Sequence, residues 1–223
     1  RQAFNYAINK PNLIDVVENG KGVPARGVLP PNFPAFDPNR PVAYPYNLDK
    51  AKQLLSEAGW KDTNNNGTVD KDGQEMKVTF WHNQNERFTK LGSILQGDLK
   101  KLGVDIELRS MEWAPYLEKV RSHEATFFRL GWQADYPDPD NFLWTLLSSE
   151  NIGGDNSSRY SNPVVDKLFK EARSTTDWAK REKRYRQAET IIVEEAAWLF
   201  LYSGIEYKLV QPYVKHQQVH PLI

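Results

Sequence analysis

Apolar residues recur along the chain at two spacings, and each spacing predicts one kind of secondary structure. Repeats every three or four residues give a helix one apolar face, and alternation gives a strand one apolar face. The helical spacing predicts helices over residues 1–8, through Leu13, Ile14 and Val17, and over 48–58, 86–102, 113–120, 141–147, 162–172 and 178–195. Alternating or continuous apolar runs predict strands over residues 76–81, 104–108, 126–132, 198–202 and 206–214.

The order of these elements indicates the fold class. Residues 76–108 are predicted to form a strand, a helix and a second strand. A crossover of this length lets the second strand lie parallel to the first. We therefore expect an α/β fold, with a mixed or parallel sheet and flanking helices.

The segment 23–46 is rich in proline and shows no sustained periodicity. A stretch of this length without regular structure is uncommon inside a compact domain. Two interpretations remain open: the segment is a wall or lid over a binding site, or it is a connection that meanders over the surface.

Residues 131–143 combine aromatic, acidic and proline residues in a short space. Two prolines two positions apart exclude a helix interior and a central strand. The residues therefore predict a stiff loop at the end of a buried strand, a place where binding residues are often carried. Asp135 stands between Trp132 and Tyr136. We expect its carboxylate to be partly desolvated and to need a cation from the protein or from a ligand.

Composition narrows the classes of partner. The 29 basic and 29 acidic residues give a formal net charge of zero, so nothing indicates binding to nucleic acid or to an anionic membrane. The absence of cysteine excludes thiol catalysis, disulfides and thiolate metal sites.

No apolar run reaches the roughly 20 residues that span a bilayer. Because the chain opens on a helical pattern without an initiator Met, we expect it to be a piece of a longer protein.

The residues offer little support for catalysis. No nucleophile elbow, phosphate-binding loop or dinucleotide fingerprint is present. Asp135, Asp138 and Asp140 could be paired carboxylates for glycoside hydrolysis, but their place in one proline-rich loop favours turn formation and helix capping. The histidines are spread without the spacing of metal ligands, at His82, His123, His216 and His220. We expect a protein that is not an enzyme and that carries no cofactor.

Residues 62–73 resemble the first half of a calcium-binding loop. Glycine stands at the sixth position of the stretch, as an EF-hand requires. The twelfth position is also glycine, where an EF-hand has a bidentate Glu, and the second flanking helix is missing. Asparagine and glycine are ordinary turn residues as well, so a calcium site and a plain turn both stay open. The candidate ligands would be Asp62, Asn64, Asn66 and Asp70.

Several motifs, in this order, resemble the large C-terminal lobe of the peptide-binding proteins of ABC transporters. These are the dipeptide- and oligopeptide-binding proteins of extracellular solute-binding family 5. The resemblance covers nearly the whole chain. It is carried by residues 1–8, 49–60, 99–104, Trp113 with Tyr116 and Leu117, the loop 131–143, residues 160–168, and Ala188, Glu189, Ile191 and Ile192.

The resemblance implies a fold, partners and a location. The fold would be one lobe of a type II periplasmic-binding-protein architecture. Residues 1–205 would form the ligand-binding lobe, and residues 206–223 a strand and tail that return toward an N-terminal lobe outside this sequence. The whole receptor would close on a peptide and deliver it to the membrane subunits of an ABC importer. It would lie in the periplasm or outside the cell, as a membrane-anchored lipoprotein in a Gram-positive or thermophilic source.

The resemblance also implies a binding site. In peptide-binding members, the Asp of the Trp-x-x-Asp motif in this loop pairs with the ligand's α-ammonium. That role falls on Asp135, with Trp132 on the pocket wall. Trp113 matches a second aromatic of the wall, and Arg129 matches a basic residue that helps neutralise the far end of the ligand in oligopeptide binders.

One position departs from the family. Dipeptide-binding members carry an Arg directly after the strand predicted over 76–81, where it takes the ligand's carboxylate. This chain has His82 there, with Arg87 five residues further on. Longer peptides or a non-peptide ligand then become more plausible. An oligosaccharide stacked on tryptophan stays open, since the chain has seven, as does a sensory or regulatory protein that uses the same lobe.

Overall fold

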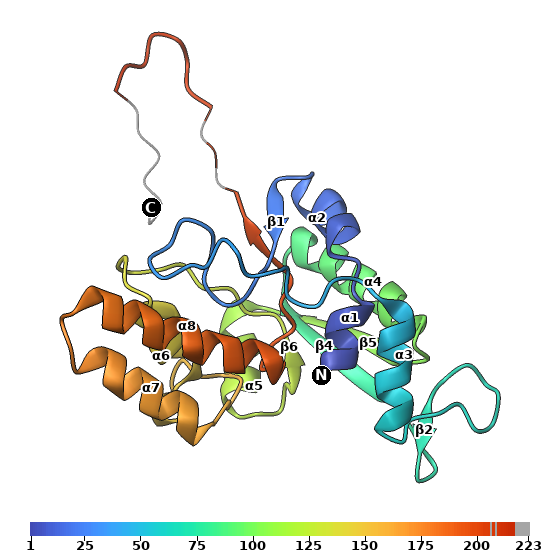
Figure 1. Cartoon of the computed structure of the whole chain (residues 1–223). Coiled ribbons are helices and arrows are strands. Elements are labelled where there is room, and N and C mark those ends of the chain that lie inside the picture. Colours follow the sequence, from blue (N-terminus) through green and yellow to red (C-terminus); the bar gives the residue numbers. More distant parts are fainter. Residues whose placement is uncertain (206, 208, 217–223) are drawn as a thin grey trace.

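The computed structural model describes residues 1–205, 207 and 209–216 (Figure 1). A short 3-10 turn spans Ser149–Asn151. None of the helices in these ranges is long and apolar enough to cross a membrane. The α-helices are α1 Gln2–Ala7, α2 Lys10–Glu18, α3 Leu48–Glu57, α4 Glu86–Lys100, α5 Trp113–Arg121, α6 Asp140–Leu147, α7 Pro163–Arg173 and α8 Trp178–Glu194.

The main sheet has three parallel strands in the order β5-β4-β6. β4 (Lys77–Asn83) pairs with β5 (Asp105–Met111) along its whole length, and α4 connects them. The predicted strand-helix-strand unit and its parallel pairing are thus confirmed. β6 (Phe127–Phe128) lies on the other side of β4.

The antiparallel pairs lie outside the main sheet. β1 (Gly22–Pro24) pairs with β7 (Tyr202–Gly204), and β2 (Asp70–Lys71) pairs with β3 (Gln74–Glu75). The fold is therefore α/β as expected, with its parallel and antiparallel pairings in separate sheets.

Two main clusters of buried side chains form the core. One lies where α1, α3 and α4 cover the sheet (Figure 1), and includes Ala7, Leu55, Phe80, Leu91, Leu95, Leu99 and Ile106. The other lies where α6, α7 and α8 pack together, and includes Leu143, Leu147, Val165, Phe169, Tyr185, Ala188 and Ile192. The second cluster supports the helix that follows the aromatic loop.

The proline-rich segment 25–46 packs against α8. It contributes Ala25, Val28, Leu29, Ala35, Ala43 and Tyr44 to the second cluster. Other residues of the segment, among them Pro31, Asn32, Pro45 and Tyr46, are exposed, and residues 23–24 of the predicted stretch belong to β1 (Gly22–Pro24). The segment therefore contributes to the core with some side chains, and its role as a wall over a binding site or as a surface connection stays a prediction. Arg186 on α8 helps to hold the segment, because its Nε and Nη2 donate to the carbonyl oxygens of Ala35 and Phe36.

A buried carboxylate on α8 fixes the beginning of this segment. Glu189 accepts hydrogen bonds from the backbone N–H groups of Val28 and Leu29, both at 2.8 Å. Its other oxygen lies 3.0 Å from Nη1 of Arg40, with both side chains largely buried. Burial raises the pKa of Glu189, while Arg40 and the two backbone donors act in the opposite direction. Paired in this way, the charge is tolerated inside the core.

The strand predicted over 198–202 is wrong in its bounds. The strand is β7, Tyr202–Gly204, and it pairs with β1, which the sequence pattern did not predict. The buried side chain of Asn5 takes the place of a partner strand for the preceding residues. Its Nδ2 donates to the carbonyl of Trp198, and its Oδ1 accepts from the N–H of Phe200. A side chain thus satisfies backbone groups that the apolar pattern assigned to a sheet.

The strand predicted over 206–214 is not found in the described part of that range. Residues 206 and 208 lie outside the described residues, and so do 217–223. Tyr207 and residues 209–214 have no paired strand in the described chain. Leu209 is 92% exposed, and the segment extends away from the body of the molecule (Figure 1). The division at residue 205 and the return toward another lobe stay predictions.

Lys10 is a buried cation near the start of the chain. It is 2% exposed, and its Nζ donates to the carbonyl oxygens of Asn5 at 3.2 Å and Tyr44 at 2.6 Å. These bonds join α2 to the end of the proline-rich segment. Burial lowers the pKa of Lys10 from 10.5 to about 8.

Gly27 is required by the close approach of Glu189. A Cβ at this position would lie 2.5 Å from the Oε1 atom of Glu189. That oxygen is held by the N–H groups of Val28 and Leu29, and the other oxygen of the carboxylate by Arg40. We expect Gly27→Ala to lower the free energy of unfolding by about 1–3 kcal/mol in chemical denaturation, because the buried pair must shift. Gly97→Ala is the control. A Cβ there has no neighbour within 4 Å, so the change should stabilise α4 by up to about 1 kcal/mol. Equal effects at both positions would contradict the close approach.

The buried position of Lys10 predicts a pH dependence of stability. Between pH 8 and 10.5 the folded chain has released a proton that the unfolded chain still binds. The free energy of unfolding should therefore rise with pH across that window, by at most about 3 kcal/mol relative to Lys10→Met. Urea denaturation of both proteins at several pH values measures this difference. Two curves that stay parallel would show that Lys10 is not buried as described.

Candidate functional site

The aromatic loop leaves the sheet at its carboxyl edge. β6 lies parallel to β4, and the N–H of Arg129 still donates to the carbonyl of Trp81 at 3.0 Å. The strand predicted over 126–132 is therefore shorter than expected, because the chain beyond Arg129 turns toward α6. Open parallel sheets bind ligands at the carboxyl ends of their strands. The loop stands at that edge.

The side chain of Asn141 organises this loop. Asn141 lies in the first turn of α6 and is 2% exposed. Its Oδ1 accepts hydrogen bonds from Nε1 of Trp132 at 2.8 Å and from the N–H of Asp135 at 3.1 Å. Its Nδ2 donates to Oδ2 of Asp135 at 3.2 Å. One buried amide therefore orients the indole of Trp132 and the carboxylate of Asp135 together.

Sequence reasoning did not select Asn141. The residue sits at the start of an apolar helix, where an amide side chain is ordinary. The apolar residues that follow it, Phe142 and Leu143, point in other directions of the helix and give no sign that Asn141 itself is buried. The pattern contained nothing to indicate which groups it would bind.

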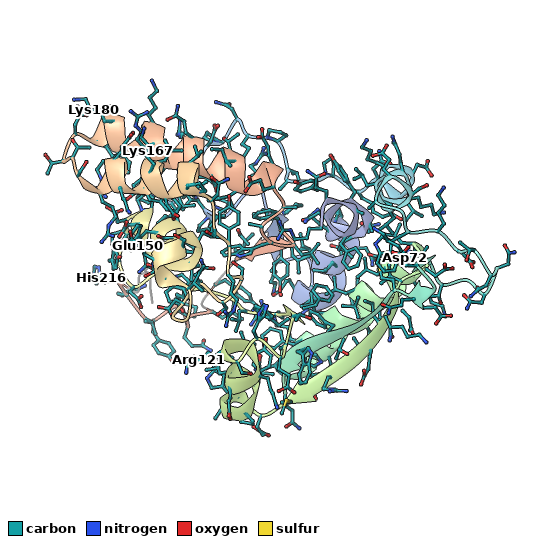
Figure 2. All side chains as sticks on the ribbon, turned by 90° about the horizontal axis from the view of Figure 1, so that it is seen from below. Asp72, Arg121, Glu150, Lys167, Lys180 and His216 are labelled. Atoms are coloured by element: carbon teal, nitrogen blue, oxygen red, sulfur yellow. The ribbon has the colours of Figure 1, made fainter. Side chains whose placement is uncertain are left out.

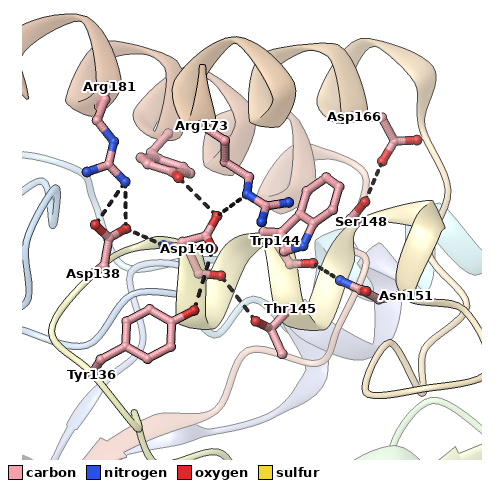
Figure 3. Close-up of polar contacts among 11 residues, drawn as sticks. Tyr136, Asp138, Asp140, Trp144, Thr145, Ser148, Asn151, Asp166, Arg173 and Arg181 are labelled. Carbon is pink, nitrogen blue, oxygen red and sulfur yellow. Dashed lines mark hydrogen bonds and ion pairs between the residues drawn. The ribbon is translucent and has the colours of Figure 1, made fainter. Parts of the chain in front are cut away.

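The other two acids of the loop are paired with basic residues (Figure 3). Nη2 of Arg181 on α8 lies 3.0 Å and 2.8 Å from the two carboxylate oxygens of Asp138. Asp140 lies 3.3 Å from Nε of Arg173 and accepts a hydrogen bond from the hydroxyl of Tyr185. Burial, together with the nearby Asp140 carboxylate, raises the pKa of Tyr185. Asp138 and Asp140 thus fasten the loop to α7 and α8. Asp138 accepts a hydrogen bond from the N–H of Asp140, as expected of a turn residue, but no side chain caps α6, so the capping role expected of these acids is not found.

Asp135 differs from these two acids. Its side chain is exposed, so the expected partial desolvation is wrong for this chain. In the described part of the molecule, no basic side chain forms an ion pair with it, and its Oδ2 is held by Asn141. Asp135 is an oriented carboxylate, open to solvent, beside an indole whose position is also fixed.

Trp132 and Trp113 are both too exposed to be core residues. Trp132 is 37% exposed and Trp113 is 52% exposed. Trp113 begins α5, and its ring lies 6.0 Å from the ring of Tyr116. The hydroxyl of buried Tyr116 donates to the carbonyl of Arg129. Trp113 is thus linked through Tyr116 to the backbone of Arg129, and Trp132 is linked through Asn141 to Asp135.

Arg129 is a half-buried cation at the start of the loop. Its guanidinium lies over the ring of Phe88, 3.8 Å from the ring centre. A Cβ added to Gly131 would lie 2.9 Å from its Nη2, so the guanidinium folds back against the loop. Burial lowers the pKa of Arg129, and the nearby positive charge of Arg87 acts in the same direction. Within the described residues, Arg129 forms no ion pair with a carboxylate.

His82 and Arg87 do not replace the arginine of dipeptide-binding members. His82 is buried, and its Nδ1 lies 3.0 Å from the carbonyl oxygen of Asn83. Arg87 forms an ion pair with Glu18. The cation that the resemblance requires directly after the predicted strand 76–81 is thus absent from that position, where His82 continues β4. Arginines on neighbouring segments include Arg87, Arg109 and Arg129.

The candidate calcium loop uses its side-chain oxygens to build turns. Asp62 accepts from the backbone N–H groups of Asn66 and Gly67, and Asn64 also accepts from Asn66. The buried carboxylate of Asp70 accepts from the N–H and hydroxyl of Thr63. Within residues 1–205, 207 and 209–216, no three acidic or histidine side chains are grouped as a metal site. These contacts are those of the plain-turn interpretation.

Comparison with known proteins identifies the family. The sequence profile described as "Bacterial extracellular solute-binding proteins, family 5 Middle" matches residues 1–154. The chain is 36% identical over 220 residues to heme-binding protein A of Haemophilus influenzae, covering 96% of this chain and 38% of that protein. It is 33% identical over 223 residues to the dipeptide-binding protein of Escherichia coli strain K12, covering all of this chain and 40% of that protein. The chain thus spans about two fifths of these relatives.

The fold agrees with a solved member. The oligopeptide-binding protein AppA of Bacillus subtilis, solved in complex with a nonapeptide, superposes with a TM-score of 0.85 at 30% identity, covering 99% of this chain and 44% of that one. The relatives are solute-binding proteins. This chain therefore belongs to the bacterial extracellular solute-binding proteins of family 5.

Proposed function

We propose that this chain forms one wall of the ligand cleft in a peptide-binding component of an ABC importer. Asp135 binds the ligand's α-ammonium, Trp132 and Trp113 provide aromatic surface, and Arg129 balances the ligand's anionic end. The observation that carries the proposal is the state of Asp135. It is exposed and oriented by Asn141, and no basic residue of the described chain forms an ion pair with it.

The chemistry of the loop supports an ammonium as the partner. An ammonium offers charged N–H donors, and a carboxylate that is already oriented loses little freedom on binding them. The neighbouring indole of Trp132 presents an aromatic face, which also attracts a cation. The pairing of Asp138 with Arg181 and of Asp140 with Arg173 leaves Asp135 as the acid of this loop that is open to a ligand.

The partners and the location follow from the same proposal. A second lobe of the same protein would supply the opposite wall of the cleft, and the membrane subunits of an ABC transporter would receive the ligand. The protein would act in the periplasm or outside the cell, held by a lipid anchor where no periplasm exists. Its role is to bind a solute and release it unchanged, without catalysis.

The relatives differ in what their names say they bind, so the ligand must be tested directly. They include heme-, dipeptide- and oligopeptide-binding proteins. A ligand that stacks on Trp132, such as an oligosaccharide, would depend on the indole and not on the charge of Asp135. Loss of binding in Trp132→Ala with full binding in Asp135→Asn would favour that second class of ligand.

The role of Asp135 predicts a specific loss of affinity. In the intact protein, Asp135→Asn should weaken binding of a free-amine peptide by about 10–100-fold in isothermal titration calorimetry, because charge-assisted hydrogen bonds contribute about 1.5–3 kcal/mol. N-terminal acetylation of the peptide should weaken binding to the unmodified protein by a similar factor. Acetylation should change little in Asp135→Asn, since the charge that it removes no longer has a partner.

Asp72→Asn provides the matched control for that experiment. Asp72 is an exposed acid on the β2–β3 turn, far from α6–α8 in the molecule (Figure 2). It should leave affinity unchanged. Equal affinity of Asp135→Asn and the unmodified protein for the free-amine peptide would rule out the ammonium site.

The role of Asn141 predicts a second, indirect loss. Asn141→Ala leaves Trp132 and Asp135 without their shared partner, and peptide affinity should fall about tenfold for roughly one lost hydrogen bond to a charged group. In a protein that already carries Asp135→Asn, the Asn141→Ala change should cause a smaller further loss of peptide affinity than it causes alone, because both changes affect the same carboxylate. Asn151→Ala removes a hydrogen bond to the carbonyl of Trp144 at the other end of α6 and should not affect binding. Full additivity would show that Asn141 does not act through Asp135.

A further inference from the structure

Three polar side chains meet where α2, α4 and β7 come together. Nε and Nη2 of Arg87 lie 2.7 Å and 2.6 Å from Oε1 of Glu18. The hydroxyl of Tyr202 donates to the same oxygen of Glu18. The side chain of Glu18 is 11% exposed, whereas that of Arg87 is 42% exposed. The carboxylate is therefore enclosed, while the guanidinium keeps access to solvent.

Neither charge is placed to stabilise its own helix. Glu18 is the last residue of α2, where the helix dipole disfavours a negative charge. Arg87 lies in the first turn of α4, where the dipole disfavours a positive charge. Each is tolerated because the other neutralises it. Helix stability thus gives no reason for an Arg at this position, which lies just after the carboxyl end of β4.

Arg87 and Arg129 share one aromatic neighbour. The guanidinium carbon of Arg129 lies 3.8 Å from the centre of the Phe88 ring, and that of Arg87 lies 5.9 Å from the same centre. Within the described residues, Arg87 forms an ion pair with Glu18, and Arg129 forms none. Two cations and one internal anion therefore leave one net positive charge beside the start of the aromatic loop.

We propose that Glu18 is a specificity-determining residue, which masks Arg87 so that the cleft offers a single net positive charge to the anionic end of the ligand. A peptide with a neutral C-terminal residue carries one carboxylate at that end, and the single positive charge balances it. A peptide with an acidic C-terminal residue carries a second carboxylate there, which Glu18 repels. This inference rests on the proposed peptide binding, and it adds a preference against acidic C-terminal residues.

Competition between two peptide pools tests the preference in the intact protein. The pools contain the same free-amine peptides of three to nine residues, ending in Gln in one pool and in Glu in the other. Mass spectrometry of the bound fraction gives the Glu-to-Gln ratio. Glu18→Gln should raise that ratio about fivefold, the effect of one partly exposed charge pair of about 1 kcal/mol. The change preserves the shape of the side chain, and thermal melting reports any structural damage separately.

Two further variants determine whether the effect passes through Arg87. Glu18→Gln combined with Arg87→Gln should return the ratio to that of the unmodified protein, because the unmasked cation is gone. Glu86→Gln removes an exposed acid that pairs with Lys90 on the same helix, and should leave the ratio unchanged. A Glu18→Gln protein that binds both pools in the original ratio would overturn the proposal, whatever its melting temperature. An unmodified protein that binds neither pool would overturn the proposed peptide binding itself.

Discussion

The arrangement of the candidate site depends on one buried amide. Asn141 holds the indole of Trp132 and the carboxylate of Asp135 through hydrogen bonds of 2.8 to 3.2 Å. The amide can do this only while α6 stays in place. The first residue of α6, Asp140, accepts a hydrogen bond from the hydroxyl of Tyr185 on α8, and the Asp138–Arg181 pair fastens the preceding loop to the same helix. α8 in turn carries Glu189, which binds the proline-rich segment 25–46 inside the core. The orientation of two exposed side chains therefore rests on contacts that reach far into the molecule.

Charge placement divides the acids of the loop into two kinds. Asp138 and Asp140 are partly buried and paired, which is the state that a desolvated carboxylate needs. Asp135 is exposed, so water solvates its carboxylate and no cation is required to stabilise the charge. A second wall closing over the loop would desolvate Asp135, and the charge of an ammonium would then count for more than it does in water.

The sequence predicted the elements whose patterns are long and local. Periodic apolar residues predicted the helices α3, α4, α7 and α8. The strand-helix-strand order predicted the parallel pairing of β4 with β5. Two of the misses come from contacts between residues that are far apart in the chain. Asn5 replaces a partner strand for residues 198–200, and Glu189 binds the backbone of the proline-rich segment. Asn141 is close in sequence to Trp132 and Asp135, but the apolar pattern does not indicate which groups a buried amide will bind. The place of Asp135 between two aromatic residues marked it as a carboxylate in need of a cation, but its role toward an α-ammonium and the roles of Trp132, Trp113 and Arg129 came from a resemblance to a family.

The most direct measurement is mass spectrometry of the ligand that co-purifies with the intact protein. The account predicts peptides with free amino termini, because the oriented carboxylate of Asp135 is suited to an α-ammonium. A bound population made of heme, of sugars or of peptides with blocked amino termini would contradict it.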